Sequence, residues 1–455
     1  MEGLLSQVFS IPLGSDRYLV YAPLHRLAFI GNGILVNHVF EHCAGTATQV
    51  SFHSDDLSSI RRLLQPLGPP HDEYAETGVS YDSVILFLTN QCNLRCSYCY
   101  ASAGEHPLEM MPWEIAKGGI DFIVREALAK QKPAIALGFH GGGEPSLNWA
   151  VLRKSVEYAR KVAGRSGLGL TVSGAFNAYW PDKVVRFVLE NFTDLSISFD
   201  GLPDIQNTQR PTKGGRGSYT RVAKTLHALD QAKFRYGIRM TVTDASVSYL
   251  EESVRHICES FKPHTIQVEP VFPQGRATDG GPALTDHGAF IHQFIKAFHT
   301  AGEHGVMLFY SGARPEALTT RFCLAACRAL VLTPDGGVTT CFEIYSRRHP
   351  LADRFMVGLY DGNGGFSIDR AKLRGLMMCG DSSSCSACFC RWHCAGDCAT
   401  KASHMVTGEA IRHADRCLVT QELTNFLILH RIEQSGGLMW YEPQGQPNQS
   451  EEGLR

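Results

Sequence analysis

The stretch VILFLTNQCNLRCSYCY (84–100) joins a short apolar run to a loop that carries three cysteines. Cys92, Cys96 and Cys99 have the spacing C-x3-C-x2-C, and no fourth cysteine follows nearby. Thiolates at such spacing hold iron–sulfur clusters or zinc. Three thiolates satisfy three irons of a four-iron cluster and leave the fourth iron open for another ligand. A zinc ion would instead need a fourth protein ligand, for which His106 is the nearest histidine.

The apolar run is the first of six that alternate with helical patterns before residue 305. The expected strands are 84–89, 134–140, 168–174, 195–201, 236–243 and 265–271, and the expected helices are 112–130, 148–164, 181–192, 218–234, 248–261 and 286–304. This alternation indicates an α/β fold with a parallel sheet buried on both faces. Six units would form a partial (β/α)6 barrel of the TIM-barrel kind. In such folds the chemistry gathers in the loops after the strands.

The rest of the chain lacks this rhythm. From about residue 320 cysteines dominate, which predicts a segment organised by metal rather than by an apolar core. The last residues are polar and broken by Gly and Pro, which predicts a loose tail. The expected domains are 1–80, 81–315, 316–432 and 433–455.

Composition excludes several classes of partner. Apolar residues make up 44% and charged residues 19% of the 455, as in soluble globular proteins. A net charge of −2 does not favour binding to nucleic acid. No apolar stretch is long enough for a membrane span. The N-terminus has no signal-peptide pattern. We therefore expect a cytoplasmic protein. Ten of the 15 cysteines lie between Cys323 and Cys417, and this clustering favours metal sites over disulfides.

The cysteine loop, with aromatic Tyr98 in the pattern C-x3-C-x-aromatic-C after the first strand, resembles the radical S-adenosylmethionine (radical SAM) superfamily. The resemblance implies that Cys92, Cys96 and Cys99 hold a [4Fe–4S] cluster, with Tyr98 covering it. SAM would chelate the open iron through its amino and carboxylate groups. Reductive cleavage of SAM would then give a 5′-deoxyadenosyl radical that abstracts hydrogen from the substrate.

A second motif, HGGGEP (140–145), follows the second expected strand and resembles the GGE motif of that superfamily. Glycines let the backbone approach a ligand closely. The resemblance implies that Gly142, Gly143 and Glu144 hold the methionine ammonium of SAM. A tight turn with no ligand is the alternative.

A third motif, SISFDG (196–201), ends the fourth expected strand and resembles the SxDG strand end of the superfamily. Ser198 is then a candidate for contact with SAM. Arg210 follows shortly after and could pair with a carboxylate as a fork. A structural role is the alternative for both residues.

The C-terminal cysteines form an ordered array. The stretch CSACFCRWHCAGDC begins at Cys385 with the spacing C-x2-C-x5-C-x3-C, and four residues separate Gly336 from Cys341 upstream. The array resembles the SPASM extension of radical SAM enzymes, which carries two auxiliary [4Fe–4S] clusters and would bring the total to three. The implied ligand sets are Cys323, Cys327, Cys341 and Cys398, and Cys385, Cys388, Cys394 and Cys417. Cys379 and Cys390 are extra and could substitute, and a structural zinc ribbon is the alternative.

The residues after Cys341 bear on the substrate. Many SPASM enzymes modify ribosomally made peptides by thioether, carbon–carbon or carbon–oxygen crosslinks or by epimerisation, and others oxidise a sulfatase side chain to formylglycine. Sulfatase-maturing enzymes typically place an Asp base directly after the equivalent cysteine, whereas this chain has Phe342 and then Glu343. The resemblance favours a crosslinking peptide maturase with Glu343 as candidate base. Sulfatase maturation and a non-catalytic iron–sulfur or zinc protein are the alternatives.

Residues 1–80 are expected to form a small α+β domain, with strands at 17–24 and 27–39 and a helix at 55–68. They loosely resemble the winged-helix peptide-recognition domain of many peptide maturases, which adds a leader-peptide strand to a sheet edge. An extension of the barrel is the alternative. The expected partners are a precursor peptide with a leader and an electron donor such as flavodoxin or ferredoxin.

Overall fold

The computed structural model describes residues 8–44, 70–72, 74, 78–278, 280–377, 385–403 and 414–441. The chain forms two compact units. One comprises Met1–Asp72, Gly312–Phe322 and Cys379–Arg455, and the other comprises Glu73–Ser311 and Cys323–Met378. These bounds differ from the expected domains, because the segment after Cys323 joins the barrel and the last part of the chain joins the N-terminal residues.

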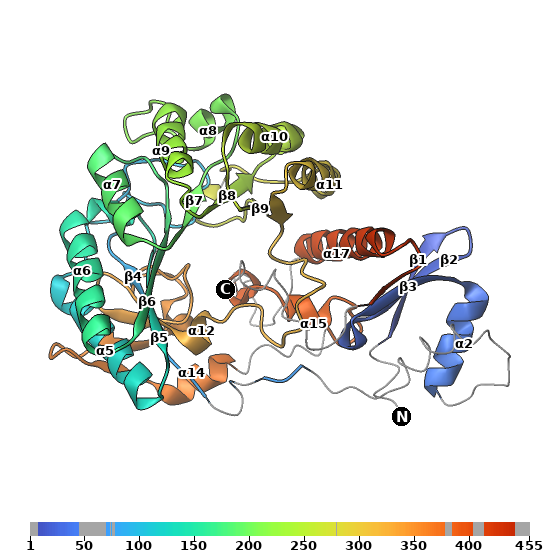
Figure 1. The fold of residues 1–455 in the computed structure, drawn as a ribbon, viewed down its shortest axis with the longest axis horizontal. Coiled ribbons are helices and arrows are strands. Elements are labelled where there is room, and N and C mark those ends of the chain that lie inside the picture. Colours follow the sequence, from blue (N-terminus) through green and yellow to red (C-terminus); the bar gives the residue numbers. More distant parts are fainter. Residues whose placement is uncertain are drawn as a thin grey trace. The chain divides into compact units, whose positions relative to one another are not determined.

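The six predicted strand–helix pairs are all present in the barrel unit (Figure 1). The strands are β4 (Ser83–Phe87), β5 (Ala134–His140), β6 (Gly169–Phe176), β7 (Asp194–Ser198), β8 (Tyr236–Val242) and β9 (Thr265–Pro270). The helices are α5 (Trp113–Ala129), α6 (Trp149–Arg165), α7 (Asp182–Asn191), α9 (Tyr219–Gln231), α10 (Leu250–Ser260) and α11 (His287–Glu303). Neighbouring strands pair in parallel, and the helices line the outer side of the arc. The elements of this region that the sequence missed are short and include α8 (Pro203–Gln209) and β10 (Met307–Phe309).

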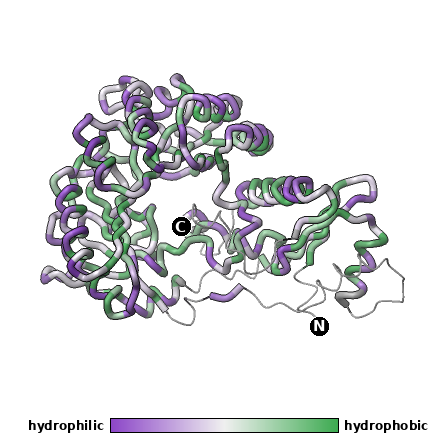
Figure 2. The backbone as a smooth tube through the Cα atoms, in the orientation of Figure 1, coloured by the Kyte–Doolittle hydropathy of each residue, from purple (hydrophilic) through white to green (hydrophobic). Residues whose placement is uncertain are grey.

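The two faces of this sheet differ along β7 to β9, so the expectation that both faces are buried is wrong for these strands. Outward residues such as Ile197 and Val268 are fully buried under the helices. Inward positions of β7 to β9 carry polar, accessible side chains: Ser198 lies opposite Arg239, and Arg239 opposite Gln267. On β4 and β11, by contrast, Phe87 and Val331 belong to a buried apolar cluster. Figure 2 shows hydrophobic segments along the strands and hydrophilic ones on the outer helices. The prediction failed because hydrophobicity averaged along a strand does not separate its two faces.

The barrel sheet continues through residues that the sequence assigned to a metal-organised domain. β11 (Ala329–Leu332) pairs in parallel with β4, and β12 (Gly337–Thr339), β13 (Met356–Tyr360) and β14 (Phe366–Ile368) add antiparallel strands. Short helices α12 (Ala325–Arg328), α13 (Ala352–Phe355) and α14 (Arg370–Met377) accompany them. All four β11 residues are buried, so this part has an apolar core. These strands are too short to show a period in the sequence.

The other unit contains a four-stranded sheet in the order β1-β2-β3-β15. Its strands are β1 (Phe9–Gly14), β2 (Arg17–Ala22), β3 (Leu27–Asn32) and β15 (Met439–Tyr441), and its helices are α2 (Gly33–Ala44), α15 (Arg391–Cys394), α16 (Ala399–Ser403) and α17 (Ala414–Gln434). β15 lies within the predicted loose tail, yet Trp440 is buried and packs on Tyr21 and Ile428. The described part of that tail is therefore ordered. The predicted helix 55–68 lies outside the described residues.

The predicted strand 27–39 is wrong beyond Asn32, because helix α2 begins there. The Asn32 side chain accepts a hydrogen bond from the Leu35 N–H at 2.9 Å, and Asp16 accepts one from the Gly33 N–H at 3.0 Å. Both carboxamide and carboxylate oxygens satisfy the free N–H groups of a helix start.

No helix within the described ranges is long and apolar enough to span a bilayer.

The pairing of β11 with β4 predicts that the segment after Cys323 unfolds together with the barrel. Leu332 is fully buried and packs against Gly119 of α5. Leu332→Ala should lower the free energy of unfolding by about 2–5 kcal/mol. The control is Leu137→Ala in β5, which is equally buried. In anaerobic urea unfolding, both variants should shift the same transition. Two transitions, each moved by only one variant, would show that the segment is a separate domain.

Candidate functional site

The cysteine loop follows β4 directly, as predicted, and is hydrogen-bonded to the end of α8 and the residues just after it. The Arg95 N–H donates to the Pro211 carbonyl at 2.7 Å, and the Ser97 N–H donates to the Gln209 carbonyl at 2.8 Å. Within the ranges that the structure describes, no three His, Cys, Asp or Glu side chains lie close enough together to hold a single metal ion.

Backbone N–H groups point at several of the predicted ligand sulfurs. Leu94 N lies 3.4 Å from Cys92 Sγ. In the same way, the backbone nitrogen two residues after Cys323 lies 3.5 Å from the Cys323 Sγ, and the one two residues after Cys341 lies 3.4 Å from the Cys341 Sγ. Such bonds stabilise thiolate ligands of iron–sulfur clusters. Burial raises the pKa of the Cys92 thiol, and it raises the pKa of Cys96 to about 11. A bound cationic metal group would offset this effect and keep the sulfurs ionised.

The GGE turn follows β5, as predicted, and packs against the start of the cysteine loop. A Cβ on Gly143 would collide with the Gln91 carbonyl oxygen and would lie 2.7 Å from the Thr89 oxygen. A Cβ on Gly142 would lie 2.8 Å from the ring of Tyr345. Glycine is therefore required at both positions, because the turn is pressed against its neighbours.

Glu144 is buried, and its carboxylate is held by residues from the next strand loop. Oε1 accepts from Ser146 Oγ at 2.6 Å and from Trp180 Nε1 at 3.1 Å, and Oε2 accepts from the Asn177 N–H at 2.9 Å. Burial raises the pKa of this carboxyl, and these bonds oppose the rise. The Asn177 side-chain nitrogen also lies 3.6 Å from Cys92 Sγ. Asn177 thus joins the GGE carboxylate to the cysteine loop, which fits a ligand that both would hold.

Sequence reasoning missed Asn177 and Trp180. Asn177 directly follows β6, at the strand end where the chemistry of such folds gathers. The position of Asn177 at a strand end is the signal by which sequence reasoning could have found it. Their bonds to Glu144 link residues more than thirty positions apart, which only the fold brings together.

Arg210 does pair with a carboxylate as a fork, but the carboxylate is that of Asp200. Arg210 Nε lies 2.9 Å from Oδ2 and Nη2 lies 3.1 Å from Oδ1. Oδ2 also accepts from the Tyr98 hydroxyl at 2.5 Å and from Gln209 Nε2 at 2.9 Å, and Oδ1 accepts from the Thr241 N–H at 3.1 Å. Asp200 is 2% exposed and Arg210 6%. The network ties the cysteine loop, through Tyr98, to the ends of β7 and β8.

Ser198 and Glu343 both belong to the barrel unit. Ser198 is the last residue of β7 and lies on the inner face. Tyr100 donates its hydroxyl to the Gly141 carbonyl at 2.8 Å, beside the GGE turn. Burial raises the pKa of Tyr100, and the nearby Glu343 and Cys341 raise it further. Glu343 therefore lies within electrostatic reach of a residue that contacts the GGE turn.

The predicted C-terminal ligands fall into both units. Cys323, Cys327 and Cys341 belong to the barrel unit, whereas Cys385, Cys388, Cys394, Cys398 and Cys417 belong to the other. Cys379 lies outside the described residues.

Some of these cysteines lie close together in the second unit. A hydrogen bond from the Cys390 thiol lowers the pKa of Cys388 to about 6. Burial raises the pKa of Cys394 to about 12, and the negative charges of Asp397, Cys388 and Cys417 add to this rise. Three of the predicted ligands, Cys388, Cys394 and Cys417, and the extra Cys390 are thus near neighbours.

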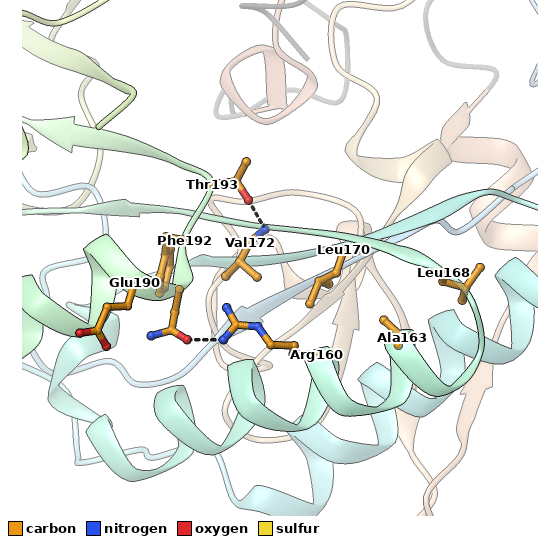
Figure 3. A pocket seen from close by; sticks show the side chains of 10 residues that line it. Arg160, Ala163, Leu168, Leu170, Val172, Glu190, Phe192 and Thr193 are labelled. Carbon is orange, nitrogen blue, oxygen red and sulfur yellow. Dashed lines mark hydrogen bonds between the residues drawn. The ribbon is translucent and has the colours of Figure 1, made fainter. Parts of the chain in front are cut away.

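A pocket of about 380 Å³ lies at the other end of the strands (Figure 3). Its lining includes Leu170 and Val172 at the start of β6, Thr193 just before β7, and Arg160, which donates to Asn191 Oδ1 at 2.7 Å. Because the cysteine and GGE loops follow the carboxyl ends of parallel strands, this pocket is remote from them.

The buried Asp200 network predicts unequal costs for two substitutions. Tyr98→Phe removes one hydrogen bond to a charged group and should lower the free energy of unfolding by about 1.5–3 kcal/mol. Asp200→Asn leaves the buried Arg210 without its counter-charge and should cost about 3–5 kcal/mol. The measurement is anaerobic urea unfolding.

The matched control is Tyr158→Phe, which removes a Tyr–Asp hydrogen bond of 2.7 Å between the helices α5 and α6. Because that pair is more accessible, the change should be within about 1 kcal/mol. Equal effects of Tyr98→Phe and Tyr158→Phe would contradict the special weight given to the Asp200 network.

Comparisons with known proteins agree with this geometry. Residues 86–260 match the model of the radical SAM superfamily. The chain is 27% identical over 264 residues to the sporulation killing factor maturation protein SkfB of Bacillus subtilis, covering 57% of this chain and 60% of that protein. It is 22% identical over 276 residues to the serine-type anaerobic sulfatase-maturating enzyme of Klebsiella aerogenes, covering 57% and 66%. The chain thus spans between 57% and 66% of the length of these and one further curated relative.

Two solved structures share the fold. The structure of anSMEcpe with bound AdoMet has a TM-score of 0.61 at 16% identity and covers 78% of this chain and 99% of its own. Streptococcus suis SuiB bound to S-adenosylmethionine has a TM-score of 0.52 at 13% identity, with coverages of 91% and 99%. The family model thus identifies residues 86–260 as a radical SAM domain, a family that implies a [4Fe–4S] cluster and SAM, and the two solved structures share the fold.

Proposed function

We propose that this chain is a radical SAM maturase that abstracts hydrogen from a ribosomally made peptide and forms a thioether, carbon–carbon or carbon–oxygen crosslink. The observation that carries the proposal is the junction at Asn177, which contacts both Cys92 of the three-cysteine loop and the carboxylate of Glu144. This contact supports the proposal that the loop and the carboxylate hold the two ends of one ligand. That ligand would be SAM, with one end on the cluster.

Different residues would hold the cluster and SAM. Cys92, Cys96 and Cys99 would ligate the [4Fe–4S] cluster, and the Glu144 carboxylate would accept the methionine ammonium. Oε2 of Glu144 accepts only the Asn177 N–H among the hydrogen bonds of the described residues, so it has capacity for a further donor. When bound, the cluster and SAM supply the reductive cleavage that makes the 5′-deoxyadenosyl radical.

Tyr98, Arg210 and Ser198 would act around this centre. Asp200 already occupies the guanidinium fork of Arg210. Arg210 and Tyr98 therefore position the loop, and any direct contact with SAM would fall to Ser198, whose hydroxyl lies on the inner face at the end of β7.

Two auxiliary [4Fe–4S] clusters would use the later cysteines in the sets Cys323, Cys327, Cys341 and Cys398, and Cys385, Cys388, Cys394 and Cys417. The N–H···S bonds at Cys323 and Cys341 support the first set. The mutual influence of Cys388, Cys394 and Cys417 supports the second. Such clusters could accept an electron from the substrate radical.

The choice of a peptide substrate rests on relatives and on one position. SkfB is described as a maturation protein for a sporulation killing factor, and anSMEcpe has been solved with AdoMet and a peptide named Kp18Cys. Phe342 stands where sulfatase-maturing enzymes typically carry an Asp base, and it stacks on His140 with 5.2 Å between ring centroids. Glu343 would then be the base. Oxidation of a sulfatase side chain is the second candidate, favoured by the Klebsiella relative.

The partners would be a precursor peptide, whose leader could bind residues 1–80, and a reductant such as flavodoxin or ferredoxin. The expected location is the cytoplasm.

The cofactor assignment predicts an iron count and a reaction. Anaerobically reconstituted protein should hold about twelve irons in three four-iron clusters and cleave SAM to 5′-deoxyadenosine when reduced with dithionite. Replacing Cys92, Cys96 and Cys99 together with Ala should abolish cleavage and leave about eight irons. Cys258→Ala, a cysteine outside every predicted set, is the control and should change neither value. Zinc in place of iron would contradict the assignment.

The substrate assignment predicts a defined mass change in a peptide. A short open reading frame beside the gene should be co-expressed with the enzyme and its product analysed by mass spectrometry. A crosslink removes two hydrogen atoms, whereas epimerisation leaves the mass unchanged. An unmodified peptide together with conversion of a sulfatase peptide to formylglycine would reject the first candidate in favour of the second.

A further inference from the structure

Arg239 is an accessible charged residue in the middle of a central strand. It belongs to β8, which pairs with β7 on one side and β9 on the other. Its neighbours in sequence, Ile238 and Met240, are 1% and 4% exposed and face the helices. Alternation along the strand therefore puts Arg239 on the inner face. An exposed side chain at this position shows that the inner face is open to solvent around it.

The guanidinium of Arg239 is not neutralised by a carboxylate. Nε donates to Gln267 Oε1 at 3.0 Å, and Arg239 forms no ion pair within the part of the chain that the structure describes. By contrast, Arg210 pairs with Asp200, and Arg276, beside the cysteine loop, pairs with Glu105. The terminal nitrogens of Arg239, which form the bidentate end of the fork, are left for another partner.

Other polar groups of the barrel strands also have unused hydrogen-bonding capacity. Gln267 Nε2 donates to Glu269 Oε1 at 2.9 Å, but Glu269 Oε2 is buried with no hydrogen-bond partner. His140, the last residue of β5, has a buried Nδ1 that is likewise unbonded. Leaving such atoms unsatisfied is costly, so they point to a polar ligand that completes the set.

The charge of Arg239 also reaches the GGE side of the sheet. Burial lowers the pKa of His140 to about 3, and the positive charge of Arg239 lowers it further. Arg239, on the inner face of β8, is therefore within electrostatic reach of the last residue of β5, which precedes the GGE turn.

We propose that Arg239 binds a carboxylate of the peptide substrate on the inner face of the barrel, from an Asp or Glu side chain or from the peptide C-terminus. A guanidinium fork matches a carboxylate in shape and charge. Glu269 and His140 would take N–H groups of the same peptide, because each offers an acceptor. The inference rests on the proposed function and names its substrate class: a peptide with an acidic group near the modified residue. The methionine carboxylate of SAM has the same chemistry, and the test separates the two.

The test uses reconstituted full-length protein and three variants. Arg239→Gln removes the charge, and Arg239→Lys keeps the charge but loses the fork. Arg235→Gln is the control, because Arg235 lies just before the same strand and pairs with Asp194 at 3.2 Å, at the opposite end of the sheet. Thermal unfolding of each variant first establishes that it is folded.

Two measurements then follow. The first is SAM affinity together with peptide-independent SAM cleavage. The second is selection of binders from a displayed random-peptide library in the presence of SAM. The unaltered protein and Arg235→Gln should enrich Asp or Glu at one position. Arg239→Gln should lose this enrichment and bind the selected peptides about tenfold or more weakly, as for a lost charge-assisted hydrogen bond. Arg239→Lys should retain part of it, and SAM affinity should stay within about twofold in all variants.

Three results would overturn the inference. Enrichment of acidic residues that persists in Arg239→Gln would mean that another residue binds them, and library selection without acidic preference would mean that no peptide carboxylate is recognised. A large loss of SAM affinity in Arg239→Gln would assign the fork to SAM instead. Failure of the unaltered protein to cleave SAM would be a different outcome, because it would reject the proposed function itself.

Discussion

The buried carboxylate of Asp200 is the point on which the arrangement of the site depends. It carries a full negative charge in a region that water does not reach, and a buried charge is tolerated only with a counter-charge and hydrogen bonds. Arg210 supplies the first, and Tyr98, Gln209 and the Thr241 N–H supply the others. Because Tyr98 lies between Cys96 and Cys99, satisfying this one carboxylate also fixes the cysteine loop over the strand ends.

A second constraint acts from the neighbouring strand loops. The GGE turn is pressed so closely against Gln91 and Tyr345 that two of its residues must be glycine. Glu144 is thereby brought to Asn177, and Asn177 to Cys92. The barrel thus presents thiols and a carboxylate on one rim. Below that rim, the inner face of β7 to β9 is polar and open, so a substrate can approach the place where a radical would form without crossing an apolar core.

The sequence predicted the barrel well because its signals are strong there. Each strand is an apolar run of five to eight residues and each helix has ten or more, so the two periods are easy to separate. Motif positions followed from this: the cysteine, GGE and SxDG stretches all lie at strand ends. The same approach failed for β11 to β14, which have three to five residues, and at Gly33, where apolar runs on both sides of Gly31, Asn32 and Gly33 hid the change from strand to helix.

The partners of individual side chains were less accessible to sequence reasoning. Arg210 was expected to meet a carboxylate, but nothing in the local pattern identified Asp200, although it lies within the quoted SISFDG motif. Asn177 and Trp180 reach Glu144 from more than thirty residues away. The strand pattern alone does not show which face of the sheet Arg239 occupies; the pairing register does. Long-range contacts of this kind depend on tertiary packing, which a single sequence does not display.

The central claim is that the cluster on Cys92, Cys96 and Cys99 has an open iron that binds SAM. Electron–nuclear double resonance of the reduced protein, with SAM carrying an isotope label on its amino nitrogen, tests this most directly. We expect a hyperfine coupling between the label and the cluster that disappears in Cys92→Ala. A cluster signal that is unchanged by SAM and shows no coupling would contradict it.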